Sequence, residues 1–248
     1  MTNREELVNI SVGARQIAGT IVFPAIAMEG VLFIHGWAGN QKQYLVRARE
    51  IAALGCVCLT FDLHGHALTS AFQAAVTRED NLQDVLAAYD LLAGLPNVNK
   101  SAIGVVGSSY GGYLSAIVSS LRPVRWLALR APALYKDDDW ALPKFQLNRE
   151  DLLSYRKSTI RAQDNRALKA CSMFQGDVLL VESEHDHIVP SSVTTNYRTA
   201  FEKSHSLTFR VIEGADHALT DLAWQQTYTS LLTSWALEII LSARKATI

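Results

Sequence analysis

The sequence predicts an α/β fold in which helices flank a mainly parallel β-sheet. Three observations support this. Short β-prone runs alternate along the chain with stretches of helical periodicity. Some of the runs are apolar throughout, as is typical of strands buried on both faces of a sheet. The chain has 248 residues, of which 49% are hydrophobic and 19% charged, so it has enough apolar side chains for a large core.

The first elements are predicted to form an antiparallel hairpin. Residues 7–12 and 16–23 alternate between polar and apolar side chains on either side of Gly13, a residue suited to a tight turn. Residues 30–34 then form a short run without a charged side chain. This run is expected to be the first strand of the parallel part of the sheet.

The next segments follow the alternation of strand and helix. Residues 42–54 have helical spacing and end at Gly55, a good residue to terminate a helix. Residues 56–61 are a predicted strand and residues 80–92 an amphipathic helix. Residues 102–106 form another strand, which leads directly into a glycine-rich turn.

The C-terminal half continues the same pattern. Further strands are expected at residues 126–129, 177–181 and 207–212, and helices at residues 113–120, 193–203 and about 222–243. We expect the whole chain, residues 1–248, to form a single domain. The segment at about 135–176 is too long for an ordinary crossover between strands and is expected to be a lid or cap insertion.

Composition excludes several classes of function. The formal net charge is −1, and no polybasic stretch indicates binding to nucleic acid or to an anionic membrane. No apolar run approaches the roughly 18 residues of a transmembrane helix. The polar first residues favour a cytoplasmic protein. Three cysteines without a framework spacing are expected to be buried thiols in a reducing compartment. The oligomeric state cannot be predicted.

The glycine-rich turn is the strongest functional signal. It contains the sequence Gly107-Ser108-Ser109-Tyr110-Gly111 between a buried strand and a helix. Such a turn holds its central serine in strained dihedral angles, so that the hydroxyl projects from the turn as a nucleophile. Only Ser109 has a glycine two residues away on each side. We therefore predict Ser109 as the nucleophile of an acyl-transfer reaction.

A serine nucleophile needs a general base and an acidic side chain that orients the base. On a fold of this kind the expected chain order is serine, acid, histidine. His217 follows the last predicted strand and is the predicted base. Asp186 follows the strand at 177–181 and is the predicted acid. The carboxylates of Glu182, Glu184 and Asp216 are alternatives to Asp186.

Two backbone N–H groups are predicted to stabilise the negative charge on the carbonyl oxygen. One belongs to Tyr110, which directly follows the nucleophile. The other belongs to Trp37, in the loop after the strand at 30–34. The neighbouring His35 and Gly36, together with Trp140 from the insertion, are predicted to line the substrate pocket.

Together these motifs resemble the α/β-hydrolase superfamily over nearly the whole chain. The resemblance implies an eight-stranded, mostly parallel sheet with the active site at the carboxyl ends of the strands. The stretch from Asp62 to His66 is similar to a turn that many members carry as Asp-x-Arg-Gly-His-Gly. Here His64 replaces the arginine and Ala67 the last glycine. The size of the chain resembles that of small bacterial carboxylesterases, including feruloyl esterases.

The resemblance implies hydrolysis of a small-molecule carboxylic ester without a cofactor. The turn also resembles that of prolyl oligopeptidase-type peptidases, so a small serine peptidase or amidase is the alternative. A non-catalytic binding relative is a second alternative. A catalytic metal is not expected, because Leu68 and Thr69 stand where a dinuclear metallohydrolase motif starting at His64 would need aspartate and histidine.

Overall fold

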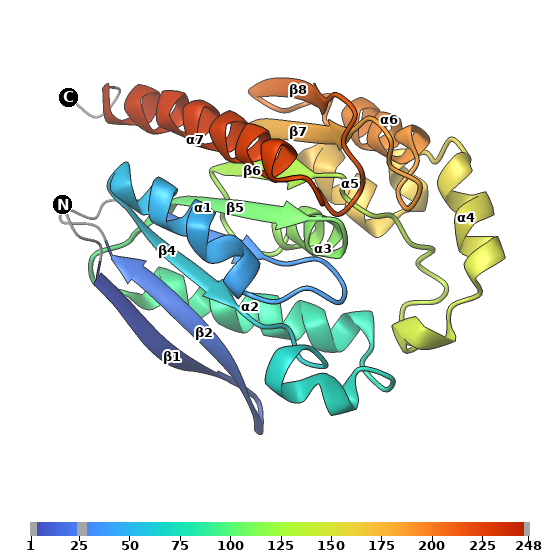
Figure 1. Ribbon diagram of the computed structural model, residues 1–248, viewed down its shortest axis with the longest axis horizontal. Helices are drawn as coiled ribbons and strands as arrows, with labels where there is room; N and C mark the ends of the chain where they lie inside the picture. The colour runs from blue at the N-terminus through green and yellow to red at the C-terminus, as the bar shows by residue number, and fades with distance from the viewer. Residues whose placement is uncertain (1–3, 24–28, 246–248) are drawn as a thin grey trace.

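One eight-stranded sheet forms the centre of the protein, in a computed structural model that describes residues 4–23 and 29–245. The strands are β1 (Arg4–Val12), β2 (Arg15–Phe23), β3 (Glu29–Ile34), β4 (Cys56–Phe61), β5 (Asn99–Ser108), β6 (Trp126–Arg130), β7 (Asp177–Ser183) and β8 (Ser206–Ile212). Their order across the sheet is β1-β2-β4-β3-β5-β6-β7-β8 (Figure 1). The β1–β2 and β2–β4 pairs are antiparallel and the other pairs are parallel. The predicted fold class is confirmed.

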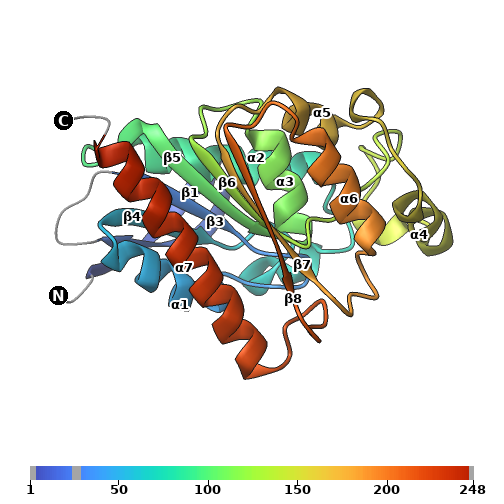
Figure 2. The same ribbon diagram turned by 90° about the horizontal axis from the view of Figure 1, so that it is seen from above.

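Helices cover both faces of the sheet (Figure 2). One face carries α1 (Lys42–Ala53) and α7 (Leu222–Lys245), which pack on each other. The other face carries α2 (Arg78–Gly94), α3 (Tyr110–Val118), α5 (Arg166–Met173) and α6 (Ser191–Ala200). Helix α4 (Arg149–Lys157) lies beyond the end of the sheet in Figure 1. Three short 3₁₀ helices complete the elements: η1 (Ala67–Phe72), η2 (Lys144–Gln146) and η3 (Ala162–Asp164).

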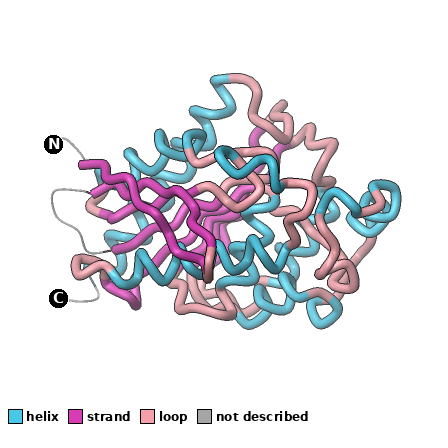
Figure 3. The backbone as a smooth tube through the Cα atoms, turned by 90° about the horizontal axis from the view of Figure 1, so that it is seen from below, coloured by secondary structure: helices cyan, strands magenta, loops and turns pink. Residues whose placement is uncertain are grey.

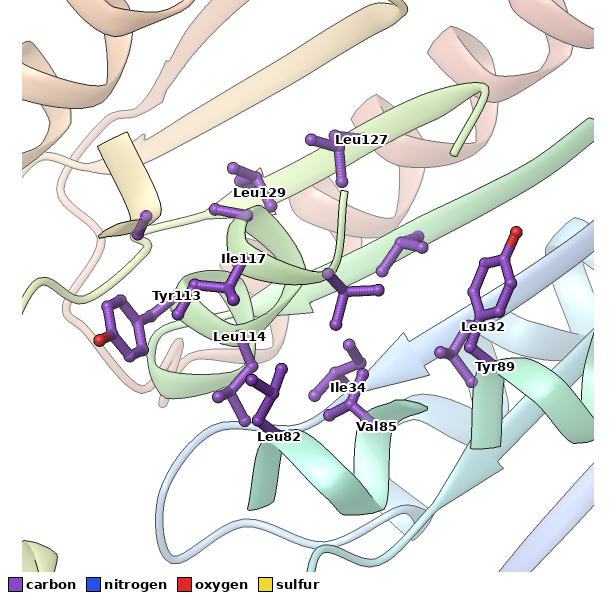
Figure 4. Close-up of a cluster of buried hydrophobic side chains, with 14 of the residues drawn as sticks. Leu32, Ile34, Leu82, Val85, Tyr89, Tyr113, Leu114, Ile117, Leu127 and Leu129 are labelled. Carbon is purple, nitrogen blue, oxygen red and sulfur yellow. The ribbon is translucent and has the colours of Figure 1, made fainter. Parts of the chain in front are cut away.

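Two apolar cores lie between the sheet and its helices. Side chains of β3, β6, α2 and α3 meet in the core on the α2–α3 face (Figure 4). The second core lies under α1 and α7 and contains Trp126, whose ring packs edge-on against Trp235. Every residue of β3 and β4 is buried, in accordance with the continuous apolar runs that predicted these strands.

Several element boundaries differ from the prediction, and for two of them a local reason is evident. Strand β5 begins at Asn99, before the predicted start at residue 102. The prediction missed its first residues because they are polar and exposed and give no apolar signal. Helix α2 begins at Arg78, because Thr77 and Asp80 form a reciprocal capping box that starts the helix before its apolar stripe.

The segment at 135–176 contains two different structures. Its C-terminal part is α5, which buries Ala167, Leu168 and Cys171 in the main core and so belongs to the helix layer. The part before α5 carries η2, α4 and η3. Figure 3 shows that loops and short helices gather beyond the strand ends, on the side away from the β1–β2 hairpin.

The described part of the chain contains no helix that is both long and apolar enough to cross a membrane. Cys56, Cys58 and Cys171 are buried and form no disulfide.

Candidate active site

Ser109 stands in the turn between β5 and α3 with dihedral angles of φ 52° and ψ −116°. A positive φ is strained for a residue with a side chain, and here it points the serine side chain out of the turn. The flanking glycines make this turn possible. A Cβ on Gly107 would lie 2.2 Å from Ser115 Oγ, and a Cβ on Gly111 would lie 2.2 Å from the carbonyl oxygen of Ile34. The turn therefore has the geometry of a nucleophile elbow.

Three side chains from three strand ends form a hydrogen-bonded chain at this turn. His217 Nε2 lies 2.9 Å from Ser109 Oγ, and His217 Nδ1 lies 2.6 Å from Asp186 Oδ2. Asp186 follows β7 and His217 follows β8, so the parallel sheet brings them to one edge. The Asp186 side chain is 3% exposed and the His217 side chain 15% exposed. The acid is thus shielded from water, while the imidazole remains reachable.

The environment of Asp186 favours its charged form. Burial raises the pKa of this carboxyl, but the hydrogen bond and charge of His217 and two backbone donors outweigh burial and lower it overall. The N–H groups of Ile188 and Val189 both donate to Oδ1, at 2.9 and 2.7 Å. These bonds leave Oδ2 directed at His217.

The alternative acids make other contacts. Glu184 accepts a hydrogen bond from the N–H of Gly214, and Asp216 accepts from the N–H and hydroxyl of Thr220. Burial raises the pKa of Glu182, which lies near the end of β7. Among these carboxylates, only that of Asp186 is hydrogen-bonded to His217.

Arg130, which the sequence analysis did not single out, holds the histidine loop in place. It ends β6 and is 7% exposed. Its Nη1 donates to the carbonyl oxygen of His217 at 2.9 Å, and its Nε donates to Ser108 Oγ at 3.3 Å. A charged side chain is unusual at the end of a buried strand, and this is the signal by which Arg130 could have been found in the sequence.

Two backbone N–H groups lie beside Ser109. That of Tyr110 is in the first turn of α3 and has no partner within the helix. The N–H of Trp37 donates to no acceptor among the described residues. A Cβ on Gly36 would lie 3.4 Å from Ser109 Cβ, so the Gly36–Trp37 loop passes close to the serine. These are the two N–H groups that the sequence predicted as donors to a carbonyl oxygen at Ser109.

His35 does not line the pocket, contrary to the prediction. Its side chain is buried, Nε2 accepts a hydrogen bond from the N–H of Leu63, and Nδ1 lies 2.7 Å from the carbonyl oxygen of Gly36. Burial lowers the pKa of His35 to about 4, so the ring is neutral at neutral pH. The Nε2 bond joins the loop after β3 to the turn after β4, and the Nδ1 bond lies within the loop after β3, so neither ring nitrogen is left for a substrate.

Trp140, which is predicted to line the pocket, is partly exposed and contacts α2 and the start of α5. Its indole N–H donates to Glu79 on α2 at 2.8 Å, and its ring lies 3.9 Å from the guanidinium carbon of Arg166. These contacts hold the segment before α5 against α2.

Lys144 was not predicted, yet it lies close to the residues named above. Its Nζ is 4.3 Å from the ring centroid of Trp37 and 5.9 Å from those of Tyr110 and Tyr135. Phe145 packs on the same Trp37 ring at 6.2 Å. Lys144 lies in the segment that the sequence analysis treated only as an insertion, and nothing in the sequence indicates that it meets Trp37.

The turn after β4 contacts the segment that contains Trp37 and Gln41. Asp62 accepts hydrogen bonds from the N–H and the side-chain amide of Gln41, at 2.7 and 3.0 Å. The buried His66 ring packs edge-on against Trp37, with centroids 4.7 Å apart. Ala67 has a φ of 48°, a left-handed conformation that suits the glycine found there in related turns.

Comparison with known families agrees with this geometry. The sequence matches the prolyl oligopeptidase family over residues 42–242, a stretch that includes Ser109, Asp186 and His217. The chain belongs to the prolyl oligopeptidase family. It is therefore a serine hydrolase of the α/β-hydrolase superfamily, as the resemblance implied.

Solved structures share the fold of this prolyl oligopeptidase family member at low identity. A dienelactone hydrolase from Anabaena variabilis is 19% identical, with a TM-score of 0.70 over 96% of this chain and 99% of its own. Est1E from Butyrivibrio proteoclasticus, with bound ferulic acid, is 17% identical, with a TM-score of 0.74 over 94% and 99%. An acylaminoacyl peptidase from Pyrococcus horikoshii is 13% identical, with a TM-score of 0.69 over 95% of this chain and 41% of its own. A search of curated proteins found no match.

Proposed function

We propose that this protein hydrolyses small carboxylic esters through an acyl-enzyme intermediate on Ser109. The observation that carries the proposal is the hydrogen-bonded chain from Ser109 through His217 to Asp186. It stands beside two backbone N–H groups, those of Trp37 and Tyr110. A nucleophile, a base, an orienting acid and oxyanion donors are the parts that acyl transfer requires.

The reaction has two steps with the same machinery. His217 Nε2 takes the hydroxyl proton of Ser109 as Oγ forms a bond to the ester carbonyl carbon. The carbonyl oxygen becomes negative and accepts hydrogen bonds from Trp37 and Tyr110. The C–O bond to the alcohol then breaks, and His217 returns the proton to the alcohol. Water attacks the acyl-enzyme by the same route and releases the acid and free Ser109.

Asp186 orients the base during both steps. Its Oδ2 accepts the Nδ1 proton of His217, so that Nε2 is free to take the proton of Ser109. The charged carboxylate also stabilises the imidazolium that forms. No cofactor is needed for this chemistry.

A peptidase or amidase of the same mechanism is the second candidate, and the family match favours it. The ester assignment draws on two similar structures that align over nearly their whole length, the dienelactone hydrolase and Est1E with ferulic acid. The peptidase from Pyrococcus horikoshii aligns over less than half of its length.

Covalent labelling tests whether the site is catalytic. A fluorophosphonate probe should label the folded protein, and Ser109→Ala should abolish labelling. Ser120→Ala, an exposed serine after α3, is the matched control and should label like the wild type. An unlabelled wild type would favour a non-catalytic binding protein.

A substrate panel separates esterase from amidase. It contains aliphatic p-nitrophenyl esters, feruloyl esters and matched amides. Amide turnover equal to ester turnover would favour the peptidase.

A further inference from the structure

Three cationic side chains surround the ring of Tyr135. Lys144 Nζ lies 5.9 Å from the ring centroid, and the guanidinium carbons of Arg78 and Arg156 lie 5.3 and 5.0 Å from it. Lys144 comes from η2, Arg78 from α2 and Arg156 from α4. Three separate elements thus bring positive charge to one place, which we call the Tyr135 cation cluster.

The Tyr135 cation cluster lacks carboxylate partners. Across residues 4–23 and 29–245, none of its three cations lies within 4.0 Å of a carboxylate oxygen. Arg78 is fully buried and donates from Nη1 to the carbonyl oxygen of Lys136, while its Nε and Nη2 have no hydrogen-bond partner. A buried charge with unused donors is unfavourable unless something binds there.

Asp137 lies near the cluster and does not neutralise it. Asp137 Oδ2 accepts a hydrogen bond from the backbone N–H of Arg166, and its charge interaction with Arg78 is longer than an ion pair. Arg156 donates to the carbonyl oxygens of Leu134 and Ile188, which are uncharged. The net charge around Tyr135 therefore remains positive.

The cluster adjoins the proposed active site through Lys144. Its ammonium sits 4.3 Å from the centroid of the Trp37 ring, and the Trp37 backbone is the proposed oxyanion donor. Gly36, the preceding residue, packs against Ser109. The loop whose Trp37 ring contacts Lys144 therefore also passes close to Ser109.

We propose that Lys144, with Arg78 beside it, binds a carboxylate on the substrate, so that the preferred esters are anionic. The proposal rests on the proposed function, because it names the substrate class of the Ser109 site. The partly exposed ring of Trp37 would contact the carbon skeleton while the cations hold the carboxylate. Burial, and next Arg156, Arg78 and Arg149, lower the pKa of Lys144 to about 7. A bound anion would offset the repulsion from the neighbouring arginines, which adds to the effect of burial.

Isosteric ester pairs test the proposal. Each pair differs only in replacing a carboxylate by a methyl ketone: monoethyl succinate and ethyl levulinate, monomethyl terephthalate and methyl para-acetylbenzoate, acetoxyacetate and acetoxyacetone. The first two pairs place the charge on the acyl part and the third places it on the alcohol part. We expect the wild type to prefer the anion in at least one pair by about tenfold or more in kcat/KM.

Lys144→Met keeps the length of the side chain and removes its charge. It should lower kcat/KM for the preferred anionic ester by about 10- to 100-fold and leave the matched ketone ester within about threefold. Lys157→Met, which removes an exposed lysine on α4, is the control and should change neither value. A wild type that prefers the neutral member of all three pairs overturns the proposal, as does equal loss on both members in Lys144→Met.

A binding measurement keeps the two proposals separable. In Ser109→Ala, calorimetry should detect binding of at least one of the three anionic esters (monoethyl succinate, monomethyl terephthalate or acetoxyacetate), and adding Lys144→Met should abolish it. Absence of binding to Ser109→Ala, together with hydrolysis of neutral esters by the wild type, overturns the carboxylate site alone. The opposite outcome is also distinguishable. If binding depends on Lys144 but the wild type neither hydrolyses esters nor reacts with fluorophosphonate, the carboxylate site is supported and the proposed function is overturned. Thermal melting of Lys144→Met checks that its fold is intact.

Discussion

Ser109 holds a backbone conformation that glycine adopts far more readily than serine. A positive φ with ψ near −116° places it outside the regions usual for residues with a Cβ. Such strain typically destabilises a protein by about 1–3 kcal/mol and persists only where surrounding contacts enforce it. Here the enforcing contacts include the bonds of Ser109 to Arg130 and Ala133 through its backbone.

Two inactive variants measure this strain. Ser109→Gly should be more stable than Ser109→Ala by about 1 kcal/mol, because glycine removes the Cβ strain but adds chain entropy to the unfolded state. Denaturant unfolding of both variants provides the comparison. Equal stabilities would mean that the turn is not strained at this residue.

Asp186 sets the tautomer of His217. Asp186→Asn should lower kcat by about 10³- to 10⁴-fold, since an amide can donate to Nδ1 and leave Nε2 protonated. Asp216→Asn is the matched control, because that carboxylate adjoins the histidine in sequence but bonds to Thr220, and it should lose less than about tenfold. Ester hydrolysis rates at fixed pH compare the two. A large loss in Asp216→Asn or Glu184→Gln would contradict the assignment of Asp186.

At the scale of elements, the contact between α3 and β3 depends on Gly111. A Cβ there would meet the backbone carbonyl oxygens of Ile34 and His35 at 2.2 and 2.6 Å, and backbone cannot move aside as a side chain can. Gly94, at the end of α2, has no atom within 4 Å of the corresponding position. The two glycines thus serve as a matched pair.

Alanine at these two positions should have opposite effects. Gly111→Ala should lower the free energy of unfolding by about 3 kcal/mol or more, because α3 must move off the sheet. Gly94→Ala should raise it by about 0.5–1 kcal/mol through helix propensity. Chemical denaturation measures both. A well-folded Gly111→Ala variant would show that α3 and β3 are not in the close contact described.

The elements themselves were predictable because each strand and helix has a local signal. Apolar runs marked β3 and β4, and periodicity marked α1 and α7. The proximity of the Gly107–Gly111 turn, His217 and Asp186 was predictable because strand ends of a parallel sheet meet at one edge. Lys144, Arg78 and Arg130 were not, because their significance arises from contacts among segments distant in sequence. His35 was misassigned because adjacency to the oxyanion loop does not reveal that a ring is buried and fully bonded.

At the scale of the whole molecule, His35 should make stability sensitive to acid. Its folded-state pKa of about 4 lies below the ordinary value of 6.5, so the unfolded chain takes up a proton first as pH falls. The resulting loss begins near pH 6.5 and continues towards pH 4. Between pH 7 and pH 5 it amounts to about 2 kcal/mol.

The variant His35→Gln isolates this contribution. It should be less stable than the wild type at pH 7, where a neutral ring makes its two bonds, and should lose about 2 kcal/mol less on acidification to pH 5. Urea unfolding of both proteins at the two pH values gives the difference. Parallel losses in the two proteins would assign acid sensitivity to other groups.

The three side chains at Ser109 come from the ends of β5, β7 and β8, and the arginine that fixes the histidine loop comes from β6. No pair of consecutive elements contains all four of these side chains. Enzymatic turnover should therefore report cooperative assembly of this half of the sheet. A library of variants screened for activity would therefore select both for an intact site and for correct pairing of four strands. A substitution in the distant β1–β2 hairpin would lower activity only if it also disturbed β4 and β3.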